Sequence, residues 1–268
     1  SEKDRLMKEI RSLTPKYKEV KEIRIMMAGQ ISAGKSSYIN TVDSVFQGHL
    51  TNRALTGKDR HTFTKEFKPY YVEDGVKGDE DGFLPFVIYD IMGIDTTVTS
   101  PDDFVSAVKG HILEKNGYTF NPIKPLSADS PDYNKSPTVN DVAHCLVYVV
   151  AADQLSIMDN HVLKIITDIR SKVSDIGIPQ VVLLTRVDEA CPLVGKDLKK
   201  VYWSRYIKAQ TEKASQILGI SINCILPVKN YHKETSLNDD IDVLALSALL
   251  QILRFANCRL QNLNQKKS

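Results

Sequence analysis

GQISAGKS, residues 29–36, fits the pattern G-x-x-x-x-G-K-[ST] at every position. The apolar run IRIMMA at 23–28 precedes it, and apolar residues recur at helical spacing from Tyr38 to Phe46 after it. A strand, a glycine-containing loop and an amphipathic helix therefore follow one another, which is the context in which this motif forms a phosphate-binding P-loop. Its glycines allow the backbone dihedrals that turn N–H groups inward, and the helix N-terminus adds further N–H donors.

The P-loop predicts a set of nucleotide-binding residues. Lys35 would reach the β- and γ-phosphates and act as a catalytic cation, and the Ser36 hydroxyl would ligate Mg²⁺. Backbone N–H groups would supply most of the remaining contacts. The full set expected around the phosphates is Gly29, Ile31, Ser32, Ala33, Gly34, Lys35, Ser36 and Ser37.

Further strands and helices alternate along the chain. Apolar patterns predict strands at 62–72, 83–91, 144–152, 180–184 and 222–226, and helices near 100–112, 158–173, 198–217 and 240–263. Ser100 as a cap and Pro101 in the first turn mark the start of the helix near 100. The strands at 144–152 and 180–184 are apolar on both faces, so we predict an α/β fold of the P-loop NTPase, G-domain-like class: a mostly parallel sheet with helices on both faces. We expect an N-terminal helix over 1–21, one P-loop GTPase-like domain over 22–268, and a surface loop or insertion at 117–137.

The second motif is D-x-x-G at the end of the predicted strand at 83–91. Asp90 lies where ligands of α/β sheets collect, so it would hold Mg²⁺ through water, and the Gly93 N–H would sense the γ-phosphate.

A threonine should complete the Mg²⁺ shell, and the sequence offers two candidates. Thr62 and Thr64 both precede or begin the predicted strand at 62–72; Thr64 is favoured slightly, also as a catalytic residue, because the basic Lys65 follows it. The polar segment 48–61 would be the mobile loop that the γ-phosphate and Mg²⁺ order.

The third motif, T-R-x-D at 185–188, bears on the base. A carboxylate at Asp188 would accept hydrogen bonds from both N1–H and N2–H₂ of guanine, a donor pair that adenine lacks. The usual guanine motif is N-K-x-D, so Thr185 and Arg186 are departures: Arg186 would lay its planar guanidinium over the purine, and the Thr185 hydroxyl would tether the P-loop. After the strand at 222–226, Lys229 or Asn230 would touch the guanine edge.

Catalysis is the least determined feature. Position 94, where Ras-like proteins place a water-orienting Gln, is Ile94, and no other water-orienting residue is identified. Arg53 or Arg60 could act as an arginine finger, but a solvated surface charge is the favoured interpretation of both residues. The sequence therefore leaves two main hypotheses: a Mg²⁺-dependent GTP/GDP-binding domain with slow GTP hydrolysis, and a GTPase-like interaction or scaffold module that does not turn nucleotide over. A P-loop protein that uses ATP is a third, which Asp188 opposes.

Composition sets the boundaries of these hypotheses. Among 268 residues, 35 Lys+Arg against 33 Asp+Glu argue against a nucleic-acid or membrane footprint. We expect no apolar run of membrane-span length, no signal peptide, a reducing compartment and a cytoplasmic location. Because the chain starts at Ser1 without a methionine, we expect a piece of a longer protein.

Four strings in this chain resemble the interferon-induced protein 44 family, the 44 and 44-like proteins. They are AGQISAGKSSYINTVDSVFQGHL at 28–50, LPFVIYDIMGID at 84–95, LLTRVDEA at 183–190 and ILPVKNYH at 225–232. The resemblance implies a cytosolic, interferon-inducible protein of the antiviral or antiproliferative response in innate immunity. It also implies a GTPase-like domain that follows a TLDc domain, and unidentified protein partners or self-association.

Overall fold

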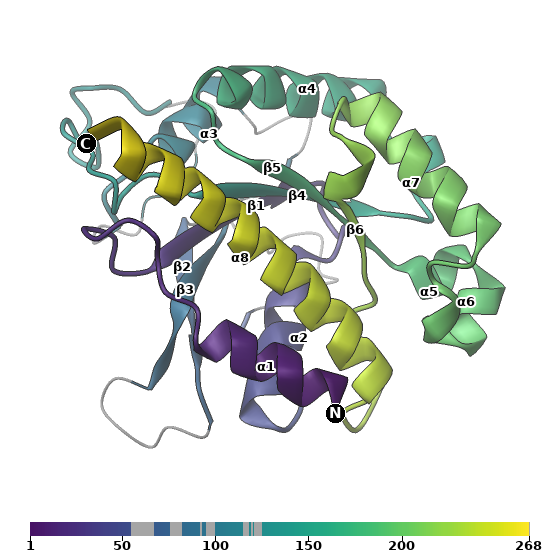
Figure 1. Cartoon of the computed structure of the whole chain (residues 1–268). Coiled ribbons are helices and arrows are strands. Elements are labelled where there is room, and N and C mark those ends of the chain that lie inside the picture. The colour runs from purple at the N-terminus through teal and green to yellow at the C-terminus, as the bar shows by residue number, and fades with distance from the viewer. Residues whose placement is uncertain are drawn as a thin grey trace.

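The computed structural model describes residues 1–54, 67–75, 82–91, 93–94, 100–114, 118, 120 and 125–267. In this part of the chain, six strands form one sheet in the order β2-β3-β1-β4-β5-β6 (Figure 1). Neighbouring strands run parallel, except that β2 is antiparallel to β3 at one edge. The strands are β1 (Ile23–Gly29), β2 (Lys68–Glu73), β3 (Phe83–Asp90), β4 (Cys145–Ala151), β5 (Gln180–Thr185) and β6 (Ile225–Pro227).

Apolar side chains on both faces of the sheet create two cores. In β4, Leu146, Tyr148 and Val150 belong to one core, and Cys145, Val147 and Val149 belong to the other, as the two-residue period of a strand requires. Every residue of β1 and β4 is buried. The predicted mostly parallel sheet, covered on both faces, is therefore confirmed.

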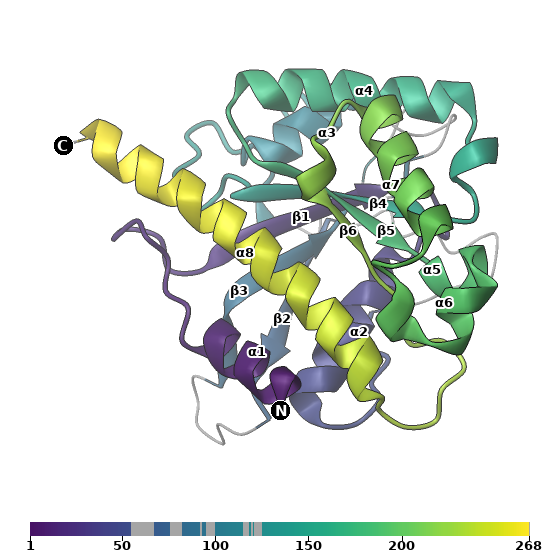
Figure 2. The same ribbon diagram turned by 45° about the vertical axis from the view of Figure 1, so that its right-hand side comes forward.

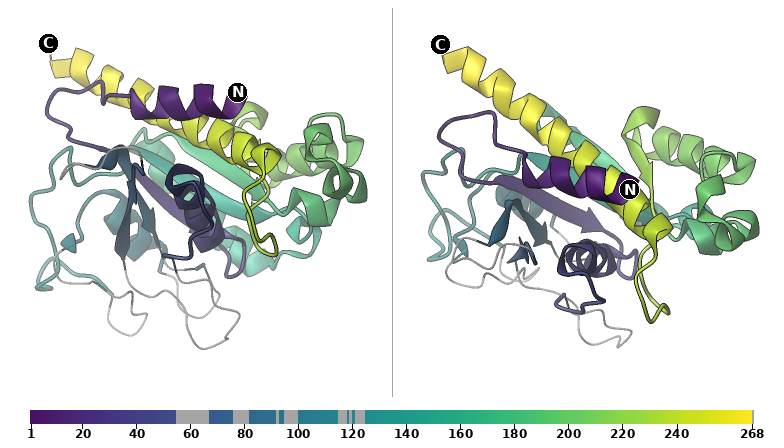
Figure 3. Two further views of the ribbon diagram at one scale, coloured as in Figure 1. Left: turned by 90° about the horizontal axis from the view of Figure 1, so that it is seen from below. Right: turned by 60° about the horizontal axis from the view of Figure 1, so that its bottom comes forward.

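Helices cover each face. One core holds side chains from α1 (Glu2–Arg11), α2 (Lys35–Gln47) and α8 (Asp239–Lys267), and Figures 2 and 3 show α1 lying along α8 on that side. The opposite core holds side chains from α3 (Pro101–Val108), α4 (Asn160–Asp175) and α7 (Arg205–Leu218). Short elements complete the described chain: α5 (Val187–Ala190), α6 (Pro192–Lys196) and the 3₁₀ turns η2 (Leu155–Ile157), η3 (Leu198–Lys200) and η4 (Ile222–Cys224).

Several elements begin or end away from their predicted positions. The N-terminal helix stops at Arg11 instead of continuing to 21. The segment after it is held on α8 by Asn257, whose side chain accepts a hydrogen bond from the Lys16 N–H and donates one to the Thr14 carbonyl. The predicted helix at 198–217 is divided into η3 and α7, because Ser204 caps a new helix start. The predicted strand at 222–226 begins only at Ile225, since η4 precedes it.

Other boundaries agree more closely. The C-terminal helix predicted at 240–263 is α8, and α3 begins at the predicted Ser100 cap with Pro101 in its first turn. Of the predicted loop at 117–137, residues 118, 120 and 125–137 are described and contain no helix or strand. Of the predicted strand at 62–72, residues 62–66 lie outside the described residues.

α8 changes one expectation from the sequence. By length and composition it could cross a membrane, with a mean hydropathy of 1.5 in its most apolar window, although no such run was expected. In the structure 67% of that window is buried, against α1, α2 and the sheet. Its apolar character is thus accounted for by the core.

Candidate nucleotide-binding site

The P-loop lies at the edge of the sheet where the parallel strands end. It leaves β1 at Gly29, whose φ is +156°, and a Cβ there would lie 2.2 Å from the Val149 carbonyl oxygen of the neighbouring strand. At Gly34 φ is +99° and a Cβ would lie 2.9 Å from Asn230 Nδ2. Backbone conformation therefore favours glycine at both positions, and at Gly29 the close approach of the β4 backbone requires it as well.

The Lys35 side chain folds back over this loop. Its Nζ donates hydrogen bonds to the carbonyl oxygens of Gly29, at 3.0 Å, and Gln30, at 3.2 Å. Burial lowers the pKa of Lys35, and the nearby Asp90 carboxylate works in the opposite direction. An ammonium held beside a glycine-containing loop at a helix N-terminus is suited to a polyphosphate.

Asp90 and Ser36 form the candidate Mg²⁺ site. The Ser36 hydroxyl donates a 2.7 Å hydrogen bond to Asp90 Oδ2, while Asp90 Oδ1 is buried and has no hydrogen-bond partner among the described residues. Burial raises the pKa of Asp90, and Lys35 and Ser36 oppose that shift. A buried carboxylate oxygen without a partner, beside a hydroxyl, fits a hydrated Mg²⁺, which takes oxygen ligands and keeps several waters.

The segment after Asp90 lies against the P-loop. The Ile94 N–H donates to the Gly29 carbonyl at 2.8 Å, and a Cβ at Gly93 would lie 2.6 Å from Ile31 Cγ1. This contact brings the Gly93 backbone next to the loop, as γ-phosphate sensing requires. Ile94 itself is fully buried in a core, so it presents no group to an attacking water.

Several predicted residues around the γ-phosphate are not placed. Thr62, Thr64 and Arg60 lie outside the described residues, as does the second half of the segment 48–61, residues 55–61. Arg53 is described, and its guanidinium pairs with Asp43 at 3.1 Å and Glu73 at 3.3 Å. These two ion pairs give Arg53 a structural role in holding α2 and β2 together.

Thr185, at the end of β5, and Asn230, in the loop after β6, both tether the P-loop. The Thr185 hydroxyl donates a 2.6 Å hydrogen bond to the Ala33 carbonyl, which is the contact expected of it, and Asn230 Nδ2 donates to the next carbonyl, that of Gly34, at 3.1 Å. Asn230 thus supplies from the loop after β6 the amide that T-R-x-D lacks at its first position. Its Oδ1 is buried without a hydrogen-bond partner among the described residues.

Arg186 lies in the left-handed region, with φ of +58°, at the start of α5. Its guanidinium pairs with Asp153 at 2.7 Å and Glu189 at 2.5 Å. These pairs use the N–H edge of the guanidinium, whereas stacking on a purine would use its planar face, so the two are compatible. Neither acid was predicted from the sequence, although Asp153 lies two residues after the end of β4, at the sheet edge where ligands collect.

Asp188 lies near the cation of Lys229. Lys229 Nζ is 3.6 Å from Asp188 Oδ2 and 2.8 Å from Glu234 Oε1. Lys229 is only 14% exposed and Asp188 9%. Glu234 was also missed, because a single acid in a polar loop gives no local signal of its partner.

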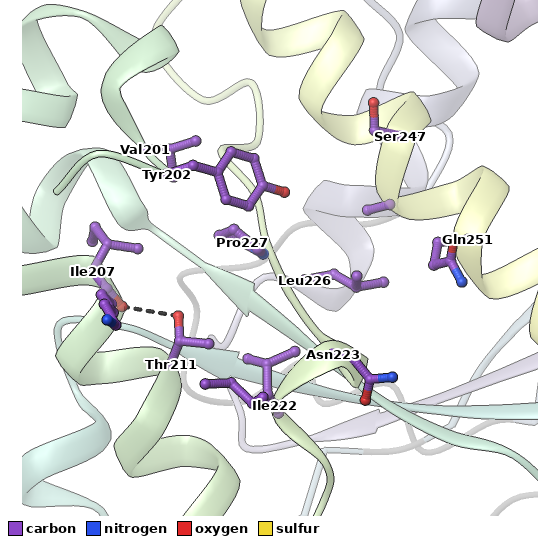
Figure 4. Close-up of a pocket in the computed structure, with 13 residues that line it drawn as sticks. Val201, Tyr202, Ile207, Thr211, Ile222, Asn223, Leu226, Pro227, Ser247 and Gln251 are labelled. Atoms are coloured by element: carbon purple, nitrogen blue, oxygen red, sulfur yellow. Dashed lines mark hydrogen bonds between the residues drawn. The ribbon is translucent and has the colours of Figure 1, made fainter. Parts of the chain in front are cut away.

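A cavity of about 470 Å³ lies away from these motifs, beside the edge strand β6 (Figure 4). Tyr202 from the turn before α7, Ile207 from α7 and Gln251 from α8 are among the side chains that line it, together with residues of β6. No residue of the P-loop, D-x-x-G or T-R-x-D motifs lines this cavity. The candidate nucleotide site is therefore the P-loop, where the side chains that could bind phosphate, Mg²⁺ and a base are found.

A comparison with models of protein families gave no match. Interferon-induced protein 44-like of Homo sapiens is 33% identical over 97% of this chain and 57% of its own length. Interferon-induced protein 44 is 32% identical in Homo sapiens, over 96% of this chain and 57% of its own length, and in Mus musculus, over 98% and 61%. The chain therefore spans about three fifths of these curated relatives (57–61%).

A solved crystal structure, described as a probable GTP-binding protein engB, aligns with a TM-score of 0.47 and 12% identity over 86% of this chain and 98% of its own. The sequence relatives cover nearly the whole of this chain and share its motif-bearing region. The chain is thus a homologue of the interferon-induced protein 44 and 44-like family.

Proposed function

We propose that this chain binds GTP and GDP with Mg²⁺ at the P-loop and hydrolyses GTP slowly. One observation carries the proposal: at a single edge of the sheet, a P-loop with its lysine, a Ser–Asp pair with a partnerless buried oxygen, and a carboxylate for the base come together. Each group matches a different part of a Mg²⁺–guanine nucleotide.

The residues of the chain divide the work. Lys35 and the backbone N–H groups of 29–37 would bind the β- and γ-phosphates, and Ser36 with Asp90 would hold Mg²⁺. When bound, Mg²⁺ supplies positive charge against the phosphate oxygens. Thr185 and Asn230 keep the loop in its binding conformation through the Ala33 and Gly34 carbonyls.

We expect slow turnover because position 94 offers no group that could orient the attacking water. Ile94 is buried, so among the described residues the main contribution left to the rate is the positioning of the phosphates. Thr64, or Thr62 in its place, remains our candidate for the additional Mg²⁺ ligand.

A second candidate function is a GTPase-like interaction module that binds nucleotide without hydrolysis. The burial of Ile94 favours it specifically, because this position then offers no catalytic group. A partner or a second copy would supply that group in the first case and be the ligand of the module in the second.

Equilibrium binding of GTP, GDP and ATP, with and without Mg²⁺, tests the nucleotide proposal. Lys35→Ala should abolish binding, and Asp188→Asn should shift preference from guanine to xanthine nucleotides. Equal affinity for ATP and GTP would exclude the base assignment. Phosphate release at high protein concentration then separates the two functions, since an undetectable rate with intact GTP binding leaves only the interaction module.

The relatives are named for induction by interferon, and we propose the same regulation, a cytoplasmic location and an antiviral role for this chain. Transcript levels after interferon treatment, imaging of the protein in cells, and viral yield with and without the gene test the three parts separately.

A further inference from the structure

The loop after β6 places a cation beside the carboxylate assigned to the base. Lys229 Nζ is 3.6 Å from Asp188 Oδ2, which is longer than an N–H···O hydrogen bond, and the side chain of Lys229 is mostly buried. A lysine is seldom so covered unless its charge has a defined partner. The position of this ammonium therefore calls for an explanation beyond solvation.

Glu234 is the group that holds the ammonium. Its Oε1 pairs with Lys229 Nζ at 2.8 Å, and its Oε2 accepts hydrogen bonds from the backbone N–H groups of His232, at 3.1 Å, and Lys233, at 3.2 Å. Burial alone would raise the pKa of Glu234, but the bonds from Lys229 and the backbone outweigh it and bring the pKa to about 2. Glu234 thus stays ionised and anchors Lys229, so Asp188 keeps its capacity to accept hydrogen bonds from a ligand.

An ammonium next to a carboxylate complements one edge of guanine. That edge carries the O6 acceptor beside the N1–H and N2–H₂ donors, while adenine presents an N6–H₂ donor in place of O6. Lys229 has three N–H donors, of which Glu234 engages one. The others would meet an acceptor in guanine and a like donor in adenine.

We propose that Lys229 is a specificity-determining residue that donates to O6 of the guanine base while Asp188 accepts from N1–H and N2–H₂. The inference rests on the proposed guanine-nucleotide function and deepens it. Discrimination against adenine then comes from two neighbouring side chains on different loops. Each attracts one part of the guanine edge, and the Lys229 ammonium also repels the N6 amine of adenine.

The test compares Lys229→Met with Lys196→Met, which removes an exposed lysine on α6. Affinities of both variants and the parent for GTP, ITP and ATP are measured by calorimetry. In Lys229→Met, GTP and ITP should each bind on the order of tenfold more weakly, because both carry O6, while ATP binding stays the same or improves. Lys229→Arg should restore part of the preference, and Lys196→Met should match the parent.

A ligand-side probe makes the test independent of folding in the variant. 6-Thio-GTP keeps N1–H and N2–H₂ but replaces O6 with a weaker acceptor, so the parent chain should bind it several-fold more weakly than GTP. An equal loss of GTP and ATP affinity in Lys229→Met, or equal binding of GTP and 6-thio-GTP by the parent, would overturn the assignment. A parent chain that binds no guanine nucleotide defeats the proposed function itself, which is a separate result.

Discussion

Thr185→Val tests whether the P-loop is held in place by the strand that carries the base motif. Thr185 is fully buried at the end of β5, and its hydroxyl donates to the Ala33 carbonyl at 2.6 Å, with the Val150 carbonyl at 3.3 Å. Valine has nearly the same shape as threonine but cannot donate. The substitution therefore removes the tether while it leaves the packing of β5 almost unchanged.

The magnitude follows from the burial of both partners. Leaving a buried acceptor without its donor costs about 1–3 kcal/mol. For a domain of this size that corresponds to a fall in the melting temperature of about 2–4 °C per kcal/mol. Because the released loop must be reordered when phosphate binds, GTP affinity should fall as well, by up to about tenfold for each 1.4 kcal/mol spent on ordering.

Reversible urea unfolding of the nucleotide-free chain gives the first quantity, and calorimetric titration with GTP and Mg²⁺ gives the second. Thr167→Val is the matched control, since among the described residues the Thr167 hydroxyl bonds to the Lys164 carbonyl of its own helix and to no other group. The reasoning is refuted if Thr185→Val and Thr167→Val have the same unfolding free energy and the same GTP affinity. A loss of stability with unchanged affinity would limit the role of Thr185 to folding.

Three further predictions concern other parts of the molecule. Gly34→Ala should weaken GTP binding at least tenfold, because a φ of +99° costs an L-residue about 1–2 kcal/mol and the added Cβ would meet Asn230 Nδ2. The control is Gly48→Ala, which has a φ of +75° and open space around it and should bind GTP as the parent does. Burial lowers the pKa of His144 from its ordinary 6.5 to about 4, so the native state keeps the imidazole neutral. Below pH 6.5 the unfolded chain binds a proton that the native state does not, so the free energy of unfolding should fall by about 3 kcal/mol as the pH drops from 6.5 to 4. In His144→Gln the free energy of unfolding should depend less on pH across that range. The same dependence on pH as in the parent chain would contradict the assignment. Lys3→Met should lower the unfolding free energy by about 3–5 kcal/mol, because it leaves the fully buried Asp242 without its cation at 2.6 Å. The same unfolding free energy in Lys3→Met and in the exposed Lys8→Met would count against this ion pair.

Much of the fold was accessible from local patterns. The two-sided apolar strands β4 and β5 predicted a covered parallel sheet, and the Ser100–Pro101 start predicted α3, since burial and capping depend on residues close in sequence. Element ends were less accessible. α1 stops at Arg11, four residues before Pro15, which cannot continue a helix; what the local pattern does not reveal is that Asn257, on the distant α8, then binds the segment after the helix.

For the candidate site, the sequence by itself determined the three motifs and their order, because each depends on spacing within one turn or strand end. Gly29 and Gly34 mark the loop, and Asp90 and Asp188 follow strands whose ends must meet at one edge. Their chemistry could be assigned before any distance was known.

Only the tertiary structure decided how these groups are supported. Asn230 donates a hydrogen bond to the P-loop, Glu234 anchors Lys229, and Asp153 pairs with Arg186. The contacts of Asn230 and Asp153 join segments that come together only when the sheet forms. A hydrogen bond or ion pair of this kind depends on distances of about 3 Å between residues on different strands and loops. Spacing along the chain carries no information about such distances, so these partners had to be seen in the folded molecule.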